Sequence, residues 1–111
     1  MSALADKLRK AREFTVEHDG MKFTVRRPTD LEMLYLRESK FGRAILPFIV
    51  GWDGVTELSM LSGGTAHPVE FDSAACAEWL EDRLDILGKI AQALYDAYAK
   101  HTEKLEVAEK N

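Results

Sequence analysis

Residues 13–26 read Glu13-Phe-Thr-Val-Glu-His-Asp-Gly-Met-Lys-Phe-Thr-Val-Arg26, and this stretch predicts a β-hairpin. Apolar and polar side chains alternate on both sides of Asp19-Gly20, a pair that tolerates the positive φ angles of a type I′ turn. Because a two-residue turn fixes the register, the hairpin has one apolar face and one polar face. The apolar pairs are Val16 with Phe23 and Phe14 with Val25, and the polar pairs are Glu17 with Lys22, Thr15 with Thr24 and Glu13 with Arg26.

The segments on either side of the hairpin predict helices. Residues 1–12 are basic and predict a short helix or an arm with little apolar surface. After the hairpin, Thr29-x-x-Glu32 has the spacing of a capping box, so a helix is expected from this point to about Ser39 or Phe41. Leu31, Leu34 and Tyr35 are expected to line one side of this helix, with Met33 and Leu36 nearby.

The middle of the chain is less regular. Residues 43–50 form a short apolar run that could be a helix or a buried strand, and Pro47 favours a helix with the proline in its first turn. Residues 51–55 predict a turn, and residues 56–68 an exposed polar loop.

The C-terminal third predicts a long helical segment. Asp72 or Ser73 is a suitable N-cap for a helix over 74–82, which continues, or restarts after a kink, from Arg83 to about Glu106. An apolar stripe with i+3 and i+4 steps is expected to face the core. It consists of Leu84, Leu87, Ile90, Ala91, Leu94 and Tyr98.

Together these segments predict a single α+β domain over 1–111, mainly α. The β-hairpin at 13–26 packs on a small helical part over 29–107, which contains the exposed loop at 56–68 and the long C-terminal helix.

Charge and composition restrict the class of protein. The net charge is −4, which argues against general nucleic-acid binding, and no apolar run approaches the length of a membrane span. Without a secretory signal, a cytoplasmic protein is expected. Residues 1–43 carry ten Lys/Arg against seven Asp/Glu, whereas residues 44–111 carry five against twelve. Such asymmetry suits head-to-tail self-association, although simple solvation of both faces also explains it.

The titratable residues form no catalytic or metal-binding motif. The three histidines are scattered, without a Cys or carboxylate at ligand spacing, and Cys76 is expected to be a buried structural cysteine. We therefore expect no enzyme activity, no cofactor and no metal. The open alternative is a small enzyme or regulator that uses the acidic residues of the C-terminal helices, which are Glu78, Glu81, Asp82 and Asp85.

A surface for a protein partner is the functional feature that we expect. Trp52, in Gly-Trp-Asp-Gly-Val, either fills the core or contributes to an apolar patch, since tryptophan is enriched at interface hot spots. The candidate partner-binding residues are Trp52, Asp53, Val55, Phe71, Trp79 and Tyr98.

The order of these segments resembles a phage family. Arg27-Pro28-Thr29 after the hairpin, the segment Val50–Val55, and Pro68-Val69-Glu70-Phe71 before a capped helix are similar to segments of the tail assembly chaperones of long, non-contractile-tailed bacteriophages. The resemblance covers roughly residues 13–100.

This resemblance implies a mainly helical protein that binds the tape measure protein and helps to recruit tail tube subunits. It also implies a homo-oligomer that works in the host cytoplasm and is absent from the mature virion. The alternative is a structural virion subunit, such as a head–tail connector or a tube-associated protein.

Overall fold

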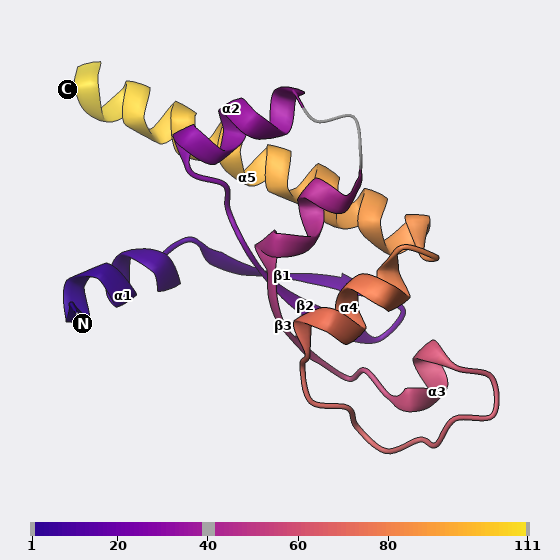
Figure 1. Cartoon of the computed structure of the whole chain (residues 1–111). Helices are drawn as coiled ribbons and strands as arrows, with labels where there is room; N and C mark the ends of the chain where they lie inside the picture. The colour runs from indigo at the N-terminus through magenta and orange to yellow at the C-terminus, as the bar shows by residue number, and fades with distance from the viewer. Residues whose placement is uncertain (1, 39–41, 111) are drawn as a thin grey trace.

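The computed structural model of the chain describes residues 2–38 and 42–110, with side chains up to residue 108, and it confirms the α+β, mainly α class. A three-stranded antiparallel sheet in the order β1-β2-β3 lies against the helices (Figure 1). Along the chain the elements are α1 (Ala3–Lys10), β1 (Glu13–His18), β2 (Met21–Arg26), α2 (Asp30–Glu38), the 3₁₀ helix η1 (Gly42–Phe48), β3 (Ile49–Asp53), α3 (Glu57–Met60), α4 (Ser73–Leu80) and α5 (Leu84–Lys110).

The predicted hairpin is confirmed in its bounds and its register. Asp19 and Gly20 have φ angles of 49° and 79°, the positive values that the turn requires. Lys22 Nζ lies 3.7 Å from Glu17 Oε1, as the cross-strand pairing predicts. Arg26 instead contacts Glu32 at 2.8 Å, so the hairpin is tied to the helix that follows it.

β3 corrects the prediction for residues 43–55. The helix expected over 43–50 ends at Phe48, and Ile49–Asp53 pairs with β2 as a strand instead of continuing into a turn. Pro47 lies in η1, before the strand, so its missing N–H interrupts no ladder hydrogen bond. The second edge of β2 is thereby paired.

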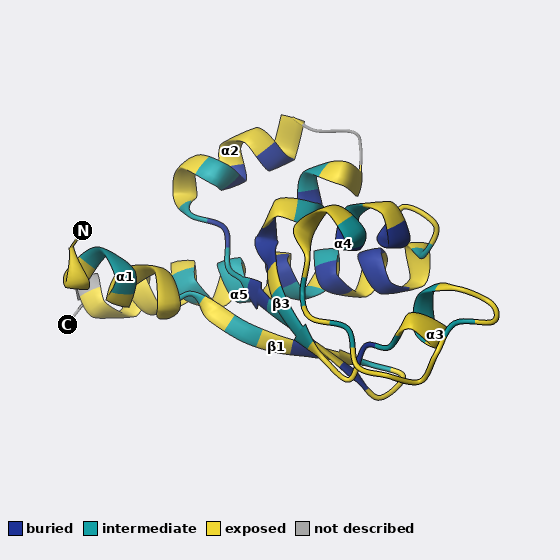
Figure 2. Cartoon of the chain, turned by 60° about the horizontal axis from the view of Figure 1, so that its bottom comes forward, coloured by how far each residue is buried: buried dark blue, intermediate teal, exposed yellow. Residues whose placement is uncertain are grey.

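The hydrophobic core lies between one face of the sheet and the helices η1, α4 and α5. The sheet contributes Phe23 and Val25, which are fully buried, and α5 contributes Ile86, Ile90 and Leu94. Figure 2 shows the buried positions of β2, β3, α4 and α5 turned toward one another.

The buried side of α2 is not its three-residue apolar stripe. Its capping box is present, because Glu32 N–H donates to Thr29 Oγ1 and Thr29 N–H donates to Glu32 Oε1. However, Met33 and Leu36 are buried, whereas the three residues predicted to line one side of the helix are exposed. The exposed side chains are Leu31 at 62%, Leu34 at 59% and Tyr35 at 68%. α2 ends at Glu38, and the other predicted helix ends, Ser39 and Phe41, lie outside the described residues.

Of the two predictions for the C-terminal helical segment, the restart is confirmed, because α4 ends at Leu80 and α5 begins at Leu84. Asp72 caps α4, since its side chain accepts from Ala74 N–H. The stripe on α5 is confirmed at Leu87, Ile90 and Leu94, which are buried, and at Ala91 and Tyr98, which are partly buried. The prediction that Leu84 belongs to the stripe is wrong, because this first residue of α5 is 77% exposed and Ile86 lies in the core instead. α5 also extends beyond Glu106, to Lys110.

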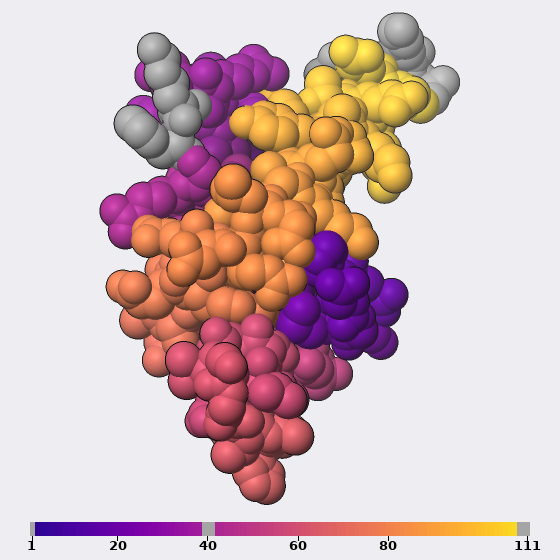
Figure 3. Space-filling model, turned by 90° about the vertical axis from the view of Figure 1, so that its right-hand side faces the viewer, coloured from indigo at the N-terminus to yellow at the C-terminus, as the bar shows by residue number. Residues whose placement is uncertain are grey.

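The segment 56–68 is mostly exposed, as predicted, but it contains the one-turn helix α3, capped by Thr56. Figure 3 shows α3 and the following loop as a narrow tip below the start of α5. At the base of this tip, Gly54 has a φ of +78°, and an added Cβ would lie 2.9 Å from the carbonyl oxygen of Gly20. Only glycine therefore fits between β3 and the hairpin turn.

Residues 1–12 include a helix, which was one of the two predictions, and α1 has no buried residue. α1 and the C-terminal part of α5 extend beyond the core, and the molecule measures 56 × 33 × 25 Å (Figure 1). Among the described residues, no helix combines the length and the apolar character that a membrane span requires.

Two leucines on α5 test which side of this helix faces the core. Leu94→Ala removes a fully buried side chain and should lower the free energy of unfolding by about 2–5 kcal/mol. Leu84→Ala alters an exposed side chain on the same helix, and its effect should stay within about 0.5 kcal/mol. Urea unfolding measures both values, and equal losses would contradict this orientation of α5.

Glu32 gives a prediction about pH. Burial opposes its ionisation, but the hydrogen bonds from Arg26 and Thr29 outweigh burial and hold the Glu32 pKa below its ordinary value. Glu32→Gln should therefore destabilise the fold by about 1 kcal/mol at pH 7. Because the folded-state pKa is lowered, this stabilisation is complete above the ordinary pKa of 4.5 and is lost as the pH falls through the folded-state value.

The measurement is urea unfolding of both proteins at several pH values. Glu38→Gln, which changes an exposed carboxyl on the same helix, serves as the control. A difference between wild type and Glu32→Gln that stays constant down to the most acid pH would refute this role of the Glu32 charge.

Candidate functional site

Two of the three segments that carry the sequence resemblance, residues 50–55 and 68–71, pack against each other. Trp52 Nε1–H donates to the carbonyl oxygen of Val69 at 2.8 Å, and Val69 N–H donates to the carbonyl oxygen of Val55 at 2.9 Å. Thr56 and Pro68 form an isolated β-bridge beside them. The end of β3 with the turn that follows it and the segment before α4 therefore form one unit.

An aromatic cluster lies at the centre of this unit. The Trp52 ring packs edge-on against Phe71, with centroids 5.0 Å apart, and against Trp79, with centroids 5.9 Å apart. The Trp79 ring also lies beside Phe23 of the central strand, with centroids 6.2 Å apart. The two edge-to-face pairs of Trp52 add stability beyond the area that they bury.

The six candidate partner-binding residues do not form one surface patch. Val55 and Trp79 are buried, so their side chains belong to the core and are not displayed to a partner. Trp52 and Phe71 are partly exposed, and Asp53 is exposed. Tyr98 lies on α5, where its hydroxyl donates to Asp30 Oδ1 of α2 at 2.8 Å. A partner can therefore reach Trp52 and Phe71 together. Asp53 follows Trp52 in β3 and pairs with Lys22, so it points to the other face of the sheet, and Tyr98 lies on a third surface.

A surface that the sequence analysis missed lies on α2. Leu31, Leu34 and Tyr35, here called the α2 ridge, have i, i+3, i+4 spacing and lie on the side of α2 opposite the buried Met33 and Leu36. The sequence of α2 contains two apolar stripes, and local spacing does not indicate which one the core takes. This ridge is the largest exposed apolar row within one turn of a described helix.

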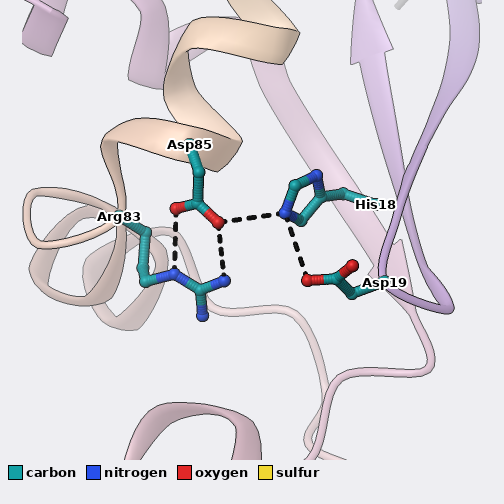
Figure 4. Close-up of polar contacts among 4 residues, drawn as sticks. All are labelled: His18, Asp19, Arg83 and Asp85. Carbon is teal, nitrogen blue, oxygen red and sulfur yellow. Dashed lines mark hydrogen bonds and ion pairs between the residues drawn. The ribbon is translucent and has the colours of Figure 1, made fainter.

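One histidine has carboxylates beside it, contrary to the prediction from spacing. His18 Nε2 lies 3.0 Å from Asp85 Oδ2 and 3.3 Å from Asp19 Oδ2 (Figure 4). Spacing could not indicate this cluster, because Asp85 lies 67 residues farther along the chain. Their possible ligand atoms lie within 4.8 Å of one another.

Arg83 determines how this cluster behaves. Its Nε–H and Nη2–H donate to the two carboxylate oxygens of Asp85 at 3.0 and 2.9 Å. The hydrogen bond from Arg83 is the main cause of a lowered Asp85 pKa, and the contact with His18 adds to it. The guanidinium thus neutralises the carboxylate that a cation would need. We assign the cluster as an ion-pair network that joins the hairpin turn to the start of α5.

Cys76 and two of the four acidic residues singled out in the sequence have defined surroundings. Cys76 is buried, as predicted, and burial raises the pKa of its thiol to about 11, so the nucleophilic thiolate is scarce at neutral pH. The acidic residues of the C-terminal helices are exposed, and Glu81 pairs with Arg43 while Asp85 pairs with Arg83.

No protein-family model, no curated protein and no solved structure matches this chain.

Trp52 tests the joined unit. Trp52→Phe keeps an aromatic ring beside Phe71 and Trp79 but removes the hydrogen bond to Val69, and it should destabilise the fold by about 1 kcal/mol. Trp52→Ala removes the ring contacts as well and should cost about 3 kcal/mol. Thermal and urea unfolding give both values, and a Trp52→Ala variant as stable as wild type would contradict the structural role of the ring.

Proposed function

We propose that this protein is a tail assembly chaperone of a long, non-contractile-tailed bacteriophage. It binds the tape measure protein in the host cytoplasm, keeps that partner soluble and helps to recruit tail tube subunits, and it is absent from the finished virion. The sequence resemblance gives this proposal its partner. The packing of two of the three resembling segments into one unit supports treating them together.

The α2 ridge is the observation that carries the proposal. Three large apolar side chains with helical spacing stand exposed on one side of a helix whose other side is buried. This is the arrangement by which apolar stripes of two helices pack against each other. A chaperone for a long helical partner needs such a surface, because the apolar stripes of that partner would otherwise aggregate.

Self-association is part of the same proposal. The basic N-terminal segment and the acidic remainder give the chain opposite charges that favour head-to-tail contacts.

A co-expression experiment tests the proposed function. The chain is produced together with the tape measure protein of the same phage, and the soluble fraction of the tape measure protein is measured. Leu34→Glu places a charge in the α2 ridge and should lower that soluble fraction several-fold, because a helix does not bury an unpaired carboxylate. Leu34 is exposed, so the variant itself should remain folded.

The matched control is Leu58→Glu, which adds the same charge at an exposed leucine of α3, away from the ridge. It should leave the tape measure protein as soluble as wild type does. If Leu34→Glu behaves like the control, the α2 ridge is not the binding surface. If wild type gives no protection and mass spectrometry finds the chain in purified particles, the protein is a structural subunit of the virion instead.

A further inference from the structure

A long groove runs between the first strand of the sheet and α5, on a different surface from the α2 ridge. One hollow of about 780 Å³ is lined by residues 14–17 of β1 and by Lys89, Gln92, Ala93 and Asp96 of α5. A second hollow of about 580 Å³ is lined by residues 11–14 and Arg27 on one side and by Ala93, Asp96, Ala97, Lys100, His101 and Lys104 on the other. The two hollows share Phe14, Ala93 and Asp96, so they form one groove, here called the β1–α5 groove.

One wall of the groove is a strand with a free edge. β1 pairs only with β2 in the described sheet, and it lies along the sheet's outer edge (Figure 2). The two-residue turn makes His18 and Met21 a hydrogen-bonded pair. Because hydrogen-bonded and non-hydrogen-bonded pairs alternate along an antiparallel ladder, Val16 and Phe14 also bond to β2 through their backbones. The backbone N–H and C=O groups of the intervening residues Glu13, Thr15 and Glu17 therefore point outward, where another strand can pair with them.

The other wall is one face of α5 with small residues near its middle. The lining residues of α5 recur with i+3 and i+4 steps from Lys89 to Lys104, a span of about 22 Å at ~1.5 Å per residue. This length matches about seven residues of extended chain. Ala93 and Ala97 have short side chains, which leave room for a backbone beside β1.

The groove is basic at one end. Arg12, Arg27, Lys100 and Lys104 line the hollow near α1, with His101 beside them, and the carboxylates there are Glu13 and Asp96. Within the described residues, Arg12, Lys100 and Lys104 form no ion pair. Burial and the positive charge of Arg12 lower the pKa of Arg27, which means that an anion bound here would relieve an unfavourable environment.

We propose that the β1–α5 groove binds an extended segment of a partner protein, which adds to β1 as an antiparallel strand and ends in carboxylates beside Arg12, Lys100 and Lys104. The antiparallel direction determines where the acidic residues of the partner strand must lie. Since β1 runs away from the basic end, an antiparallel strand finishes there, and acidic residues at its C-terminal end meet the basic side chains. Main-chain hydrogen bonds supply affinity, and the charges select the sequence.

A second copy of the chain is a poor occupant for this edge. If two β1 strands paired antiparallel so that all three outward-facing residues took part, Thr15 would face Thr15 and Glu13 would face Glu17 on both sides of the centre. Like charges directly opposite each other destabilise such pairing. The partner strand should instead carry polar or basic side chains opposite Glu13 and Glu17, and apolar ones opposite Phe14 and Val16.

The test uses two labelled peptides of identical composition. The first, Lys-Val-Thr-Val-Thr-Glu-Asp, has its acidic residues at the C-terminal end, and the second has the reversed sequence. Fluorescence anisotropy with the full chain should show that the first peptide binds roughly tenfold more tightly or better. Equal affinities, or no binding of the first peptide, would overturn the proposal.

Two variants test the hydrogen bonds and the charges separately. Thr15→Pro removes an outward N–H that β2 does not use, so the sheet should persist while peptide binding is lost. The double variant Lys100→Glu and Lys104→Glu should weaken binding by roughly tenfold or more, because it reverses the charge of the basic end. Lys7→Glu with Lys10→Glu changes the net charge equally, on α1 outside the groove, and should bind the peptide like wild type.

Circular dichroism and thermal unfolding check that each variant is folded. A folded Thr15→Pro variant that still binds the peptide would exclude strand addition. If Thr15→Pro does not fold, the Lys100 and Lys104 variant decides the matter, and unchanged binding by that variant would refute the proposal. If Thr15→Pro instead converts an oligomer of the chain into a monomer, the edge pairs with a second copy and the proposed partner is wrong.

Discussion

The pairing of β2 along both of its edges is the constraint on which the rest of the fold depends. Phe23 and Val25 point from this strand into the core and are fully buried, while β1 and β3 satisfy its backbone on either side. α5, α4 and η1 can then cover one apolar face without leaving the central strand's hydrogen-bonding groups in a dry environment. The aromatic cluster is attached to the same strand, because Trp52 is the β3 partner of Phe23 and Trp79 contacts the Phe23 ring.

The sequence could predict those parts of the fold that are determined by residues close together in the chain. Asp19-Gly20 and the alternation around it fix the hairpin register, and Thr29 with Glu32 fixes the start of α2. β3 could not be predicted in this way, because its strand character comes from pairing with residues 24 to 31 positions earlier. The sequence could not indicate which face of α2 is buried, for a related reason. Both of its apolar stripes satisfy helical spacing, and the core selects Met33 and Leu36 through contacts made elsewhere in the chain.

In the candidate site, too, the sequence indicated local features but not those that depend on distant contacts. The sequence indicated Trp52 as a candidate because a large aromatic residue stands between two glycines. In the fold its ring has a hydrogen bond and two aromatic neighbours. Val55 and Trp79 are equally apolar in the sequence, yet they fill the core, since composition does not distinguish a core side chain from a contact surface. The ion pairs around His18 and the β1–α5 groove join segments about 70 or more residues apart, so no local spacing could indicate them.

α5 changes its physical character along its length. Up to Leu94 it is held by buried side chains, so its amide hydrogens there should exchange with solvent only when the whole domain opens. Beyond Tyr98 the described side chains are exposed, apart from the partly buried His101, and these turns depend mainly on intrinsic helix stability. Their amides should exchange by local fraying. Lys100 and Lys104 lie in that second part, so a segment bound in the groove would slow hydrogen exchange in the less protected part of α5.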